Sequence, residues 1–443
     1  MLKALSNIFK IPDLRRKLLF TLGIFAVYRL GAFIPTPGID SSALAQFFDN
    51  IAQKQGGTLF GIMNMFSGGA MRRLTVFALG IMPYISASII LQLLTTVVPH
   101  LERLSKEGEA GRKKIIQYTR YGTIVLALVQ SFFISLWLEN PAHFQGLQIV
   151  QFGGWPFRLL TVLTLTTGTA FIMWLGEQIQ EFGIGNGISL IITVGIISRL
   201  PSALYQLGFY LRSGQMQPLI LVLLGAIMLG VIIAVILITQ GQRRIPVQYA
   251  RRIIGRKVYG GQSTYIPLRV NQAGVIPIIF AQSIILFPAT LAGLMPHPAL
   301  QSLANSLTRG GLLYFILYSG LIIFFAYFYT AVTFNPIDVA ENMRKYGGFV
   351  PGIRPGKPTA QYFDFILTRI ILPGAIFLAM IAIFPELLSA GLKVPFLVAS
   401  FFGGTGLLIM VGVMLDTMRQ MESHLLMRHY EGFMKKGKIR GRR

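Results

Sequence analysis

The sequence predicts an all-α polytopic membrane protein with ten transmembrane helices. Three observations support this class: 53% of the 443 residues are hydrophobic, only 13% are charged, and the charges gather between long apolar stretches. An ordinary soluble domain carries about 25% charged residues, so this composition argues against a soluble enzyme. Lys and Arg total 40 against 16 Asp and Glu, a net charge of +24, which indicates basic loops between the apolar segments.

Ten apolar windows approach the length of about 20 residues that a helix needs to cross a hydrocarbon core about 30 Å thick. They cover residues 18–34, 74–98, 118–138, 159–176, 184–207, 218–239, 272–295, 311–334, 362–384 and 395–416. The fifth window is the weakest, because Arg199 and Pro201 interrupt it. We expect it to be completed by residues 204–207 or to be short and tilted.

The distribution of Lys and Arg predicts the orientation of these helices. In a ten-span arrangement, 30 of the 40 lie in segments on the side of the N-terminus and 8 on the opposite side. Cytoplasmic loops carry the excess of positive charge in membrane proteins. We therefore expect a multi-pass protein of the plasma membrane with both termini in the cytoplasm, the N-terminal segment being residues 1–17 and the tail residues 417–443.

Two of the predicted cytoplasmic loops are long, at residues 240–271 and 335–361. In the first, apolar residues alternate with others over 245–250 and again over 266–270, on either side of Gly260-Gly261. Such period-two runs around a Gly-Gly turn predict a projecting β-hairpin, in which Pro246 suits only an edge or bulge position. In the second loop, the Gly- and Pro-rich stretch 347–356 predicts a rigid irregular loop and not a helix.

The first external loop contains an apolar, Met-rich stretch at residues 59–66 that is far too short to span the membrane. Two interpretations remain open from composition alone. One is a re-entrant segment, which is possible only where protein or a water-filled cavity surrounds it. The other is an interfacial turn that covers the external face.

The sequence lacks the residue patterns of common enzyme classes. It contains no Cys, its five His residues stand outside metal-ligand spacings, and no phosphate-binding GxxxxGK(S/T) motif occurs. No Asp, Glu or His lies near the middle of a window, where an ion-coupled transporter or an intramembrane protease needs such a residue. Arg29, toward the external end of the first span, is expected to snorkel or to pair. We predict no enzyme, no cofactor and no metal site, and an energy source in another molecule.

Eight motifs occur in order along the chain: FSGGA at 66–70, FALGIMPYISASII at 77–90, QYTRYG at 117–122, WLGEQI at 174–179, GIGNGIS at 183–189, GQRRI at 241–245, AGVIP at 273–277 and FVPGIRPG at 349–356. On these motifs the chain resembles the SecY family, the pore subunits of bacterial-type Sec protein translocases, along essentially its whole length. The resemblance implies a channel of two inverted five-span halves, residues 18–207 and 208–416, that hinge apart.

The resemblance also implies where the parts of the channel lie. The constriction would be a ring of apolar side chains: Ile81, Ile85, Ile188, Ile192, Ile279 and Ile409. Such side chains can close around any polypeptide without binding it, and an empty apolar constriction dewets and blocks ions. The stretch 59–67 looks like a re-entrant plug beneath this ring, made of Leu59, Phe60, Ile62, Met63, Asn64, Met65, Phe66 and Ser67.

A lateral gate toward lipid would lie between spans 2 and 3 and spans 7 and 8. Its candidate residues are Ser86, Gln92, Gln130, Ser283 and Phe287. Contacts between such residues are weak enough for an apolar signal segment to replace them. Taken singly, each is equally well explained as an ordinary interhelical hydrogen-bonding or packing residue.

The resemblance gives partners to the two basic loops, namely the SecA motor ATPase and the translating ribosome. The docking residues would be Arg243, Arg244, Arg251, Arg252, Arg256 and Arg354. Clustered Arg at a loop tip is suited to phosphate-rich RNA or an acidic protein surface. Further implied partners are the small membrane subunits SecE and SecG, signal sequences and nascent membrane proteins, and the lipid bilayer.

The predicted function is therefore a protein-conducting channel that passes unfolded secretory polypeptides across the membrane and releases transmembrane segments sideways into lipid. A secondary transporter of a small solute, with an inverted-repeat ten-helix fold, is the main alternative. A passive scaffold that docks ribosomes without a pore is a second one.

Overall fold

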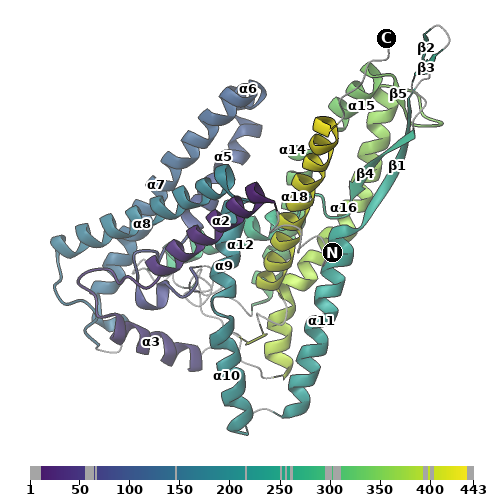
Figure 1. Ribbon diagram of the computed structural model, residues 1–443. Coiled ribbons are helices and arrows are strands. Elements are labelled where there is room, and N and C mark those ends of the chain that lie inside the picture. The colour runs from purple at the N-terminus through teal and green to yellow at the C-terminus, as the bar shows by residue number, and fades with distance from the viewer. Residues whose placement is uncertain are drawn as a thin grey trace. The chain divides into compact units, whose positions relative to one another are not determined.

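The computed structural model describes residues 11–54, 64, 67–144, 147–214, 217–249, 252–254, 257–259, 263–294, 302, 311–392, 398–399 and 404–436. The chain divides into two compact units. Figure 1 labels their helices and strands. The first comprises Met1–Arg212, Ser283–Arg309 and Ile409–Arg443, and the second comprises Ser213–Gln282 and Gly310–Leu408.

Helices build the first unit. They are α2 (Pro12–Gly31), α3 (Ser41–Lys54), α5 (Met82–Val97), α6 (Pro99–Lys106), α7 (Glu109–Glu139), α8 (Trp155–Phe182), α9 (Gly187–Ile197) and α10 (Leu200–Arg212), with 3-10 turns at η1 (Met71–Arg73) and η2 (Pro141–Phe144). Several of them begin with proline in the first turn, where its missing N–H would have had no helical partner. Helix α8 packs against α2, α7 and α9, and α7 also packs against α5.

Helix α8 approaches the backbone of other segments closely at two places, each of which involves a glycine. A Cβ added to Gly168 would lie 1.9 Å from the carbonyl oxygen of Val76. A Cβ added to Gly187, the first residue of α9, would lie 1.8 Å from the carbonyl oxygen of Gly176 in α8. Only glycine leaves room for these backbone contacts.

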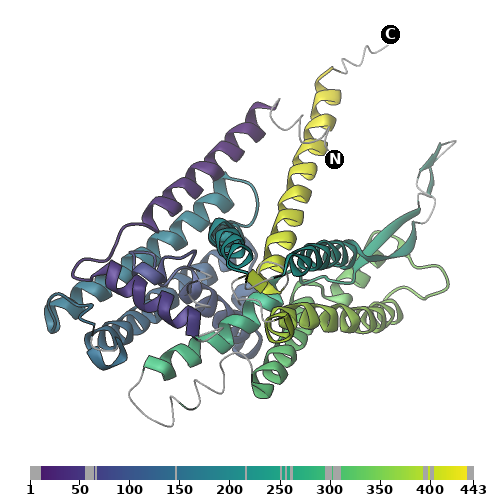
Figure 2. The same ribbon diagram turned by 90° about the horizontal axis from the view of Figure 1, so that it is seen from below.

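The second unit contains α11 (Pro218–Gln240), α14 (Leu312–Thr333), α15 (Pro336–Lys345), α16 (Lys357–Leu392) and the strands β1 (Gln242–Tyr249), β2 (Arg252–Ile254), β3 (Lys257–Tyr259), β4 (Ser263–Arg269) and β5 (Gly348–Phe349). Two helices, α12 (Ile276–Leu294) and α18 (Thr405–Lys436), begin in the second unit and continue into the first. Figure 2 shows α18 in yellow as one long helix.

The predicted all-α membrane class is confirmed. Each of the ten apolar windows overlaps a helix within the described residues, and the fifth contains two helices, α9 and α10, because the helix is interrupted at Ser198 and Arg199. Within the described residues, six helices are long and apolar enough to cross a membrane, counting α9 with α10 as one and α14 with α15 as one. A seventh span results if α5 and α6, which meet at a bend of 98°, form one. The count of ten spans stays a prediction.

The predicted hairpin is present in the second unit (Figures 1 and 2). Strand β1 pairs antiparallel with β4, with Ile245 opposite Ile266, and β2 pairs with β3 in the same register. The chain therefore reverses between Ile254 and Lys257, and the prediction of a turn at Gly260-Gly261 was wrong. The pairing register explains the difference. In an antiparallel hairpin the turn lies midway along the chain between paired residues, here Ile245 and Ile266.

The edge position predicted for Pro246 is confirmed. The sheet order is β4-β1-β5, but β5 pairs only with Gln248 and Tyr249 at the end of β1. At Pro246, β1 therefore has β4 as its only paired neighbour among the described strands. A missing N–H is tolerated there because no second strand requires it.

A hydrophobic core fixes the base of the hairpin to helices of its own unit. Ile245, Val247 and Leu268 are buried in one cluster with Met343 of α15 and Phe363 of α16. The side chains of Ile245 and Val247 alternate with exposed neighbours, as expected for a strand with one buried face. The sheet is thus part of the packed structure of the second unit.

The loop 335–361 contains a helix that the sequence reasoning missed. Helix α15 begins after Asn335, whose side chain accepts a hydrogen bond from the backbone N of Ile337 at 3.0 Å. After it, residues 347–356 are irregular as predicted, apart from the two-residue strand β5. Positive φ angles at Gly347 and Gly352 produce the turns, which explains the glycines there.

Candidate functional site

The six isoleucines of the predicted ring divide between the two units. Ile81 and Ile85 lie at the start of α5, Ile188 and Ile192 in α9, and Ile409 in α18, all assigned to the first unit. Ile279 lies in the part of α12 that belongs to the second unit. Five of the six are buried, while Ile188 is half-buried and packs on Gly176 of α8. Their meeting in one ring stays a prediction.

The start of α9 is fixed locally by the motif at 183–189. The side chain of Asn186 caps the helix by accepting a hydrogen bond from the backbone N of Ser189 at 3.2 Å. Gly185 has φ +95°, a conformation that a residue with a side chain rarely adopts. Together with the contact between Gly187 and Gly176, these features set the direction in which Ile188 leaves the turn.

Two neighbouring helices hold this turn in place. The backbone N of Ile184 donates to Thr21 Oγ1 of α2 at 3.3 Å, and the backbone N of Gly185 donates to Gln420 Oε1 of α18 at 2.9 Å. Apolar packing reinforces the tie, because Leu14 and Ile184 form a buried pair with Met421 beside it. Helices α2, α9 and α18 are thus joined at one point.

The predicted gate residues of α5 and α7 lie on helices that pack together. Ser86 of α5 and Gln130 of α7 are buried, whereas Gln92 of α5 is half-buried. The hydroxyl of Ser86 finds no hydrogen-bond partner among the described residues. A buried polar group without a partner costs about 1–3 kcal/mol, so the hydroxyl of Ser86 does not stabilise the position that it occupies.

The remaining two gate candidates lie on α12. Ser283 is buried and Phe287 is half-buried. Both fall in the part of α12 that belongs to the first unit, as do α5 and α7. The structure thus assigns all five gate candidates to one unit, and their action as a gate stays a prediction.

Only Asn64 and Ser67 of the predicted plug fall within the described residues. Leu59, Phe60, Ile62, Met63, Met65 and Phe66 lie outside them. Asn64 Oδ1 accepts a hydrogen bond from the backbone N of Arg72 at 3.0 Å, and Ser67 Oγ accepts one from the backbone N of Met71 at 3.2 Å. Both side chains are buried, so the end of the stretch is held against the turn that follows it.

The chain after the plug stretch is fixed to the end of α2. The backbone N of Thr36 donates to the carbonyl oxygen of Leu74 at 3.0 Å, and the backbone N of Val76 donates to the carbonyl oxygen of Ile34 at 3.0 Å. An isolated bridge pairs Pro35 with Thr75 between them. Sequence reasoning missed this attachment, because no periodic pattern marks an isolated bridge.

The exposed basic side chains of the predicted docking surface are Arg243 and Arg244 of β1 and Arg354 of the loop after β5. The carbonyl oxygen of Arg354 accepts a hydrogen bond from Thr359 Oγ1 at 2.8 Å, which ties its loop to α16. The side chain of Arg252 lies outside the described residues, and so do Arg251 and Arg256 entirely.

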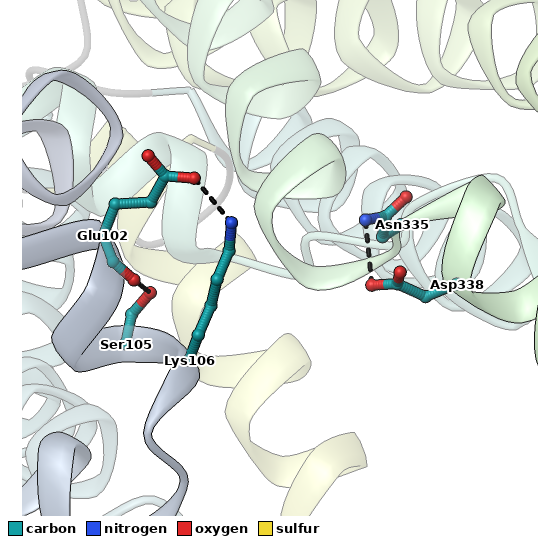
Figure 3. A network of polar contacts seen from close by, with 5 residues as sticks. All are labelled: Glu102, Ser105, Lys106, Asn335 and Asp338. Carbon is teal, nitrogen blue, oxygen red and sulfur yellow. Dashed lines mark hydrogen bonds and ion pairs between the residues drawn. The ribbon is translucent and has the colours of Figure 1, made fainter. Parts of the chain in front are cut away.

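Polar contacts also order the other loop segments that are predicted to be cytoplasmic (Figure 3). In α6, Lys106 Nζ donates to Glu102 Oε1 at 2.6 Å, and this bond keeps the pKa of the Glu102 carboxyl below its usual value. At the start of α15, Asn335 Nδ2 donates to Asp338 Oδ2 at 2.9 Å. Within the described residues no three His, Asp or Glu side chains gather in a way that could hold a metal ion.

Comparison with known proteins matches the SecY family model to residues 75–418 of this chain. The chain is 49% identical over 433 residues to the protein translocase subunit SecY of Escherichia coli strain K12, which covers 97% of this chain and 96% of that relative. It is 49% identical over 448 residues to the protein translocase subunit SecY of Streptomyces coelicolor, which covers 98% of this chain and 100% of that relative.

Three solved structures share the fold. A structure of a protein-conducting channel superimposes with a TM-score of 0.63 at 18% identity, covering 92% of each chain. A SecY structure with a plug domain gives a TM-score of 0.58 at 17% identity and the same coverage. Sec61 in the canine ribosome-channel complex from the endoplasmic reticulum gives 0.58 at 16% identity and the same coverage. At such identities the likeness concerns the fold.

Proposed function

Because this chain belongs to the SecY family, we propose that it forms the pore of a protein translocase, through which unfolded secretory polypeptides cross the membrane. The observation that carries this proposal is 49% identity with translocase subunits over nearly the full length of both chains. The chain is a multi-pass membrane protein and a non-enzymatic channel subunit. This membership sets aside the alternative of a small-solute transporter.

The constriction of the proposed pore is the ring of Ile81, Ile85, Ile188, Ile192, Ile279 and Ile409. Burial supports it, because five of these side chains are withdrawn from solvent and only Ile188 is half-buried. A ring of branched aliphatic side chains offers no fixed hydrogen bond to a passing chain, and it excludes water and ions when empty. The stretch 59–67 is the proposed plug, as in the SecY structure in which the plug domain stabilises the closed state.

The proposed lateral gate is lined by Ser86, Gln92 and Gln130, with Ser283 and Phe287 of α12. The hydroxyl of Ser86 has no hydrogen-bond partner in the described part of the chain, which supports this role because a contact that leaves a polar group unsatisfied is easily replaced. A transmembrane segment of a nascent membrane protein is the apolar competitor, and it enters lipid when its own transfer outweighs the contacts of the gate.

We place both termini and the basic loops in the cytoplasm, in a plasma membrane. The excess of Lys and Arg on that side supports the orientation. Exposed Arg243, Arg244 and Arg354, with Arg251, Arg252 and Arg256, suit a translating ribosome or the SecA motor. The fold is shared with a Sec61 chain in a ribosome-channel complex. SecE and SecG are the proposed small membrane partners.

Crosslinking tests the pore directly, because the chain has no native Cys. Single Cys residues are placed at Ile81, Ile188, Ile279 and Ile409, and a secretory precursor with one Cys is stalled midway. Disulfide formation is expected at all four positions. The matched control is a Cys at Leu229 of α11, an exposed position at which no crosslink is expected.

The outcome separates a pore from a docking scaffold. Crosslinks at the four isoleucines and not at Leu229 would put the polypeptide through the ring. Stable association of the stalled precursor without crosslinks at these four positions would mean that the polypeptide passes elsewhere, and the proposal would be abandoned.

A further inference from the structure

Arg29 is a charged residue in the last turn of α2, a helix of the predicted membrane region. A charge at such a place needs a partner, and the guanidinium of Arg29 contacts two oxygen atoms and an aromatic ring. Arg29 Nη1 donates to the carbonyl oxygen of Gly68 at 3.0 Å and to Ser198 Oγ at 3.1 Å. The guanidinium carbon also lies 4.8 Å from the ring centroid of Phe33, within the range of a cation–π contact.

The contact joins three separate parts of the first unit. Arg29 comes from α2, Gly68 from the turn that directly follows the plug stretch, and Ser198 from the C-terminal end of α9. The two acceptors are 39 and 169 residues away from Arg29 along the chain. One guanidinium thus bridges the end of α2, the turn and the end of α9.

The turn at Gly68 lies directly against the backbone of α9. Gly68 has φ +65°, and a Cβ added to it would lie 3.0 Å from the Cα of Gly195. Gly69, which follows with φ +92°, completes the left-handed turn. Glycine suits both positions because of their positive φ angles, and at Gly68 it also leaves room for the backbone of α9.

The carbonyl oxygen of Gly68 depends mainly on Arg29. Ser198 Oγ lies 3.3 Å from this oxygen but only 2.7 Å from the carbonyl oxygen of Gly195. A hydroxyl has one hydrogen to donate, and the shorter contact is the better hydrogen bond. The hydroxyl of Ser198 therefore serves Gly195 and offers its lone pairs to Arg29, while Arg29 supplies the hydrogen bond to Gly68.

We propose that Arg29 is a positioning residue that latches the turn at Gly68 to α2 and α9, and that this latch raises the free energy needed to open the channel. The inference rests on the proposed function. Displacing the turn must break a charge-assisted hydrogen bond, which is among the stronger ones in proteins. The half-buried guanidinium of Arg29 would then lose its bond to the carbonyl oxygen of Gly68 without a replacement in the described structure, which opposes opening.

The test measures how strictly the channel selects its substrates. The full chain replaces the resident SecY in a bacterial strain, and export is measured for a precursor with an intact signal sequence and for the same precursor with a defective one. Arg29→Leu is expected to raise export of the defective precursor on the order of tenfold, as the loss of one charge-assisted hydrogen bond implies. Arg29→Lys keeps the charge but loses the planar set of N–H donors of the guanidinium. Its export of the defective precursor is expected to lie between that of the parent chain and that of Arg29→Leu.

Ser198→Ala and Arg212→Leu complete the set. Ser198→Ala removes one of the two acceptors of Arg29 and is expected to raise export of the defective precursor by about two- to threefold. Arg212→Leu removes an exposed arginine at the end of α10 and is expected to leave selection unchanged. If Arg212→Leu and Arg29→Leu raised export of the defective precursor equally, the effect would follow from net charge, and the latch would be overturned.

The failure of the latch and the failure of the proposed function give different results. If the parent chain does not export the precursor with an intact signal, the proposed function fails. If it does, and Arg29→Leu accumulates normally but remains as strict as the parent, the latch is overturned. Should Arg29→Leu fail to accumulate, Ser198→Ala decides, and unchanged strictness in that variant rejects the proposal.

Discussion

Leu74 adopts a left-handed backbone conformation with φ 41°, and no other residue besides glycine does so within the described part of the chain. Such a conformation costs a residue with a Cβ about 1–2 kcal/mol. It persists here because the side chain is fully buried and both backbone polar groups of Leu74 are bonded, to Met71 and Thr36. The strain therefore marks a stretch whose geometry the surroundings dictate, between the plug stretch and α5.

The apolar character of the proposed ring can be tested at Ile409, a completely buried residue of α18. Ile409→Asn, or Ile85→Asn in α5, places an amide where no partner was provided, at a cost of about 1–3 kcal/mol to the closed state. We expect a looser constriction that leaks ions and exports precursors with defective signal sequences. Ion conductance of reconstituted channels and export in cells measure these effects.

The matched control is Met414→Asn, five residues further along α18 at an exposed position. It introduces the same side chain into the same helix without changing the proposed ring. Unchanged ion leak and unchanged signal selection in Ile409→Asn would contradict the role of the isoleucines.

Sequence reasoning reached the residues but not their partners. It placed Arg29 at the end of a span and expected it to snorkel or to pair, and the structure gives it Gly68 and Ser198. These partners could not be predicted, since contacts between residues so far apart along the chain leave no periodic signal. The isoleucines were found only through the family resemblance, because by spacing alone they are ordinary packing residues.

Among the helices, the crossing of α8 and α9 depends on the contact of Gly187 with Gly176. Gly187→Ala would place a Cβ 1.8 Å from a backbone oxygen, which cannot move without shifting α8. We expect a loss of about 1–3 kcal/mol in the free energy of unfolding, as found for overpacked sites. A lower midpoint of thermal unfolding in detergent would register this loss.

Gly225→Ala in α11 is the matched control. An added Cβ at Gly225 meets no atom within 4 Å. Alanine is a better helix former than glycine by up to about 1 kcal/mol, so this variant is expected to be neutral or slightly stabilised. A Gly187→Ala variant as stable as Gly225→Ala would show that α8 and α9 separate without cost.

The loop elements are the least predictable part of the fold. The hairpin was predicted from alternation, but the described strand pairing brings Ile254 opposite Lys257, so the chain reverses before Gly260-Gly261 and not at these glycines. Helix α15 was missed because the glycines and prolines of 347–356 suggested an irregular loop over the whole of 335–361. The first part of this segment is instead a helix whose N-terminus is capped by Asn335. Local composition identifies breakers, whereas caps and registers depend on neighbours.

The docking loop can be tested by Arg354→Glu. Arg354 is exposed, and its loop is tied to α16 through backbone contacts that do not involve its side chain. We expect SecA-driven export to fall at least several-fold while the amount of protein in the membrane stays constant, because an acidic partner surface would meet a like charge. Export rate and accumulation are measured in the same cells.

Lys345→Glu makes the same change of net charge at another exposed position, at the end of α15. A smaller effect than that of Arg354→Glu is expected, because the proposal concerns a particular site and not the total charge. A loss of accumulation equal to the loss of export in Arg354→Glu would instead indicate a folding defect.

At the scale of the whole molecule, the predicted orientation is tested by labelling. Gln151 precedes α8 and is predicted to be external, whereas Glu422 of α18 is predicted to be cytoplasmic, and both are exposed. In intact cells a membrane-impermeant maleimide is expected to label Gln151→Cys at once and Glu422→Cys only after lysis. The reverse pattern would invert the topology inferred from Lys and Arg.

Each of the ten windows identified from composition overlaps a described helix, because a membrane demands long apolar segments whatever their tertiary partners. The division of the chain is less predictable. The sequence-based halves meet near residue 207. The first segment of the first unit ends at Arg212, but this unit also contains Ser283–Arg309 and Ile409–Arg443, so that α12 and α18 each belong to both units. The two-half arrangement implied by the resemblance stays a prediction.

The hairpin has a mechanical consequence. Strand β1 alone, from Gln242 to Tyr249, extends about 25 Å at the usual rise per strand residue, while the base of the hairpin is embedded among α15 and α16. A body that grips the tip therefore works on a lever arm, and even a modest sideways force there becomes a torque on the packed helices. The torque at a given force is proportional to the length of the hairpin. Shortening the hairpin by paired deletions in both strands would therefore reduce the torque without altering the residues of the tip.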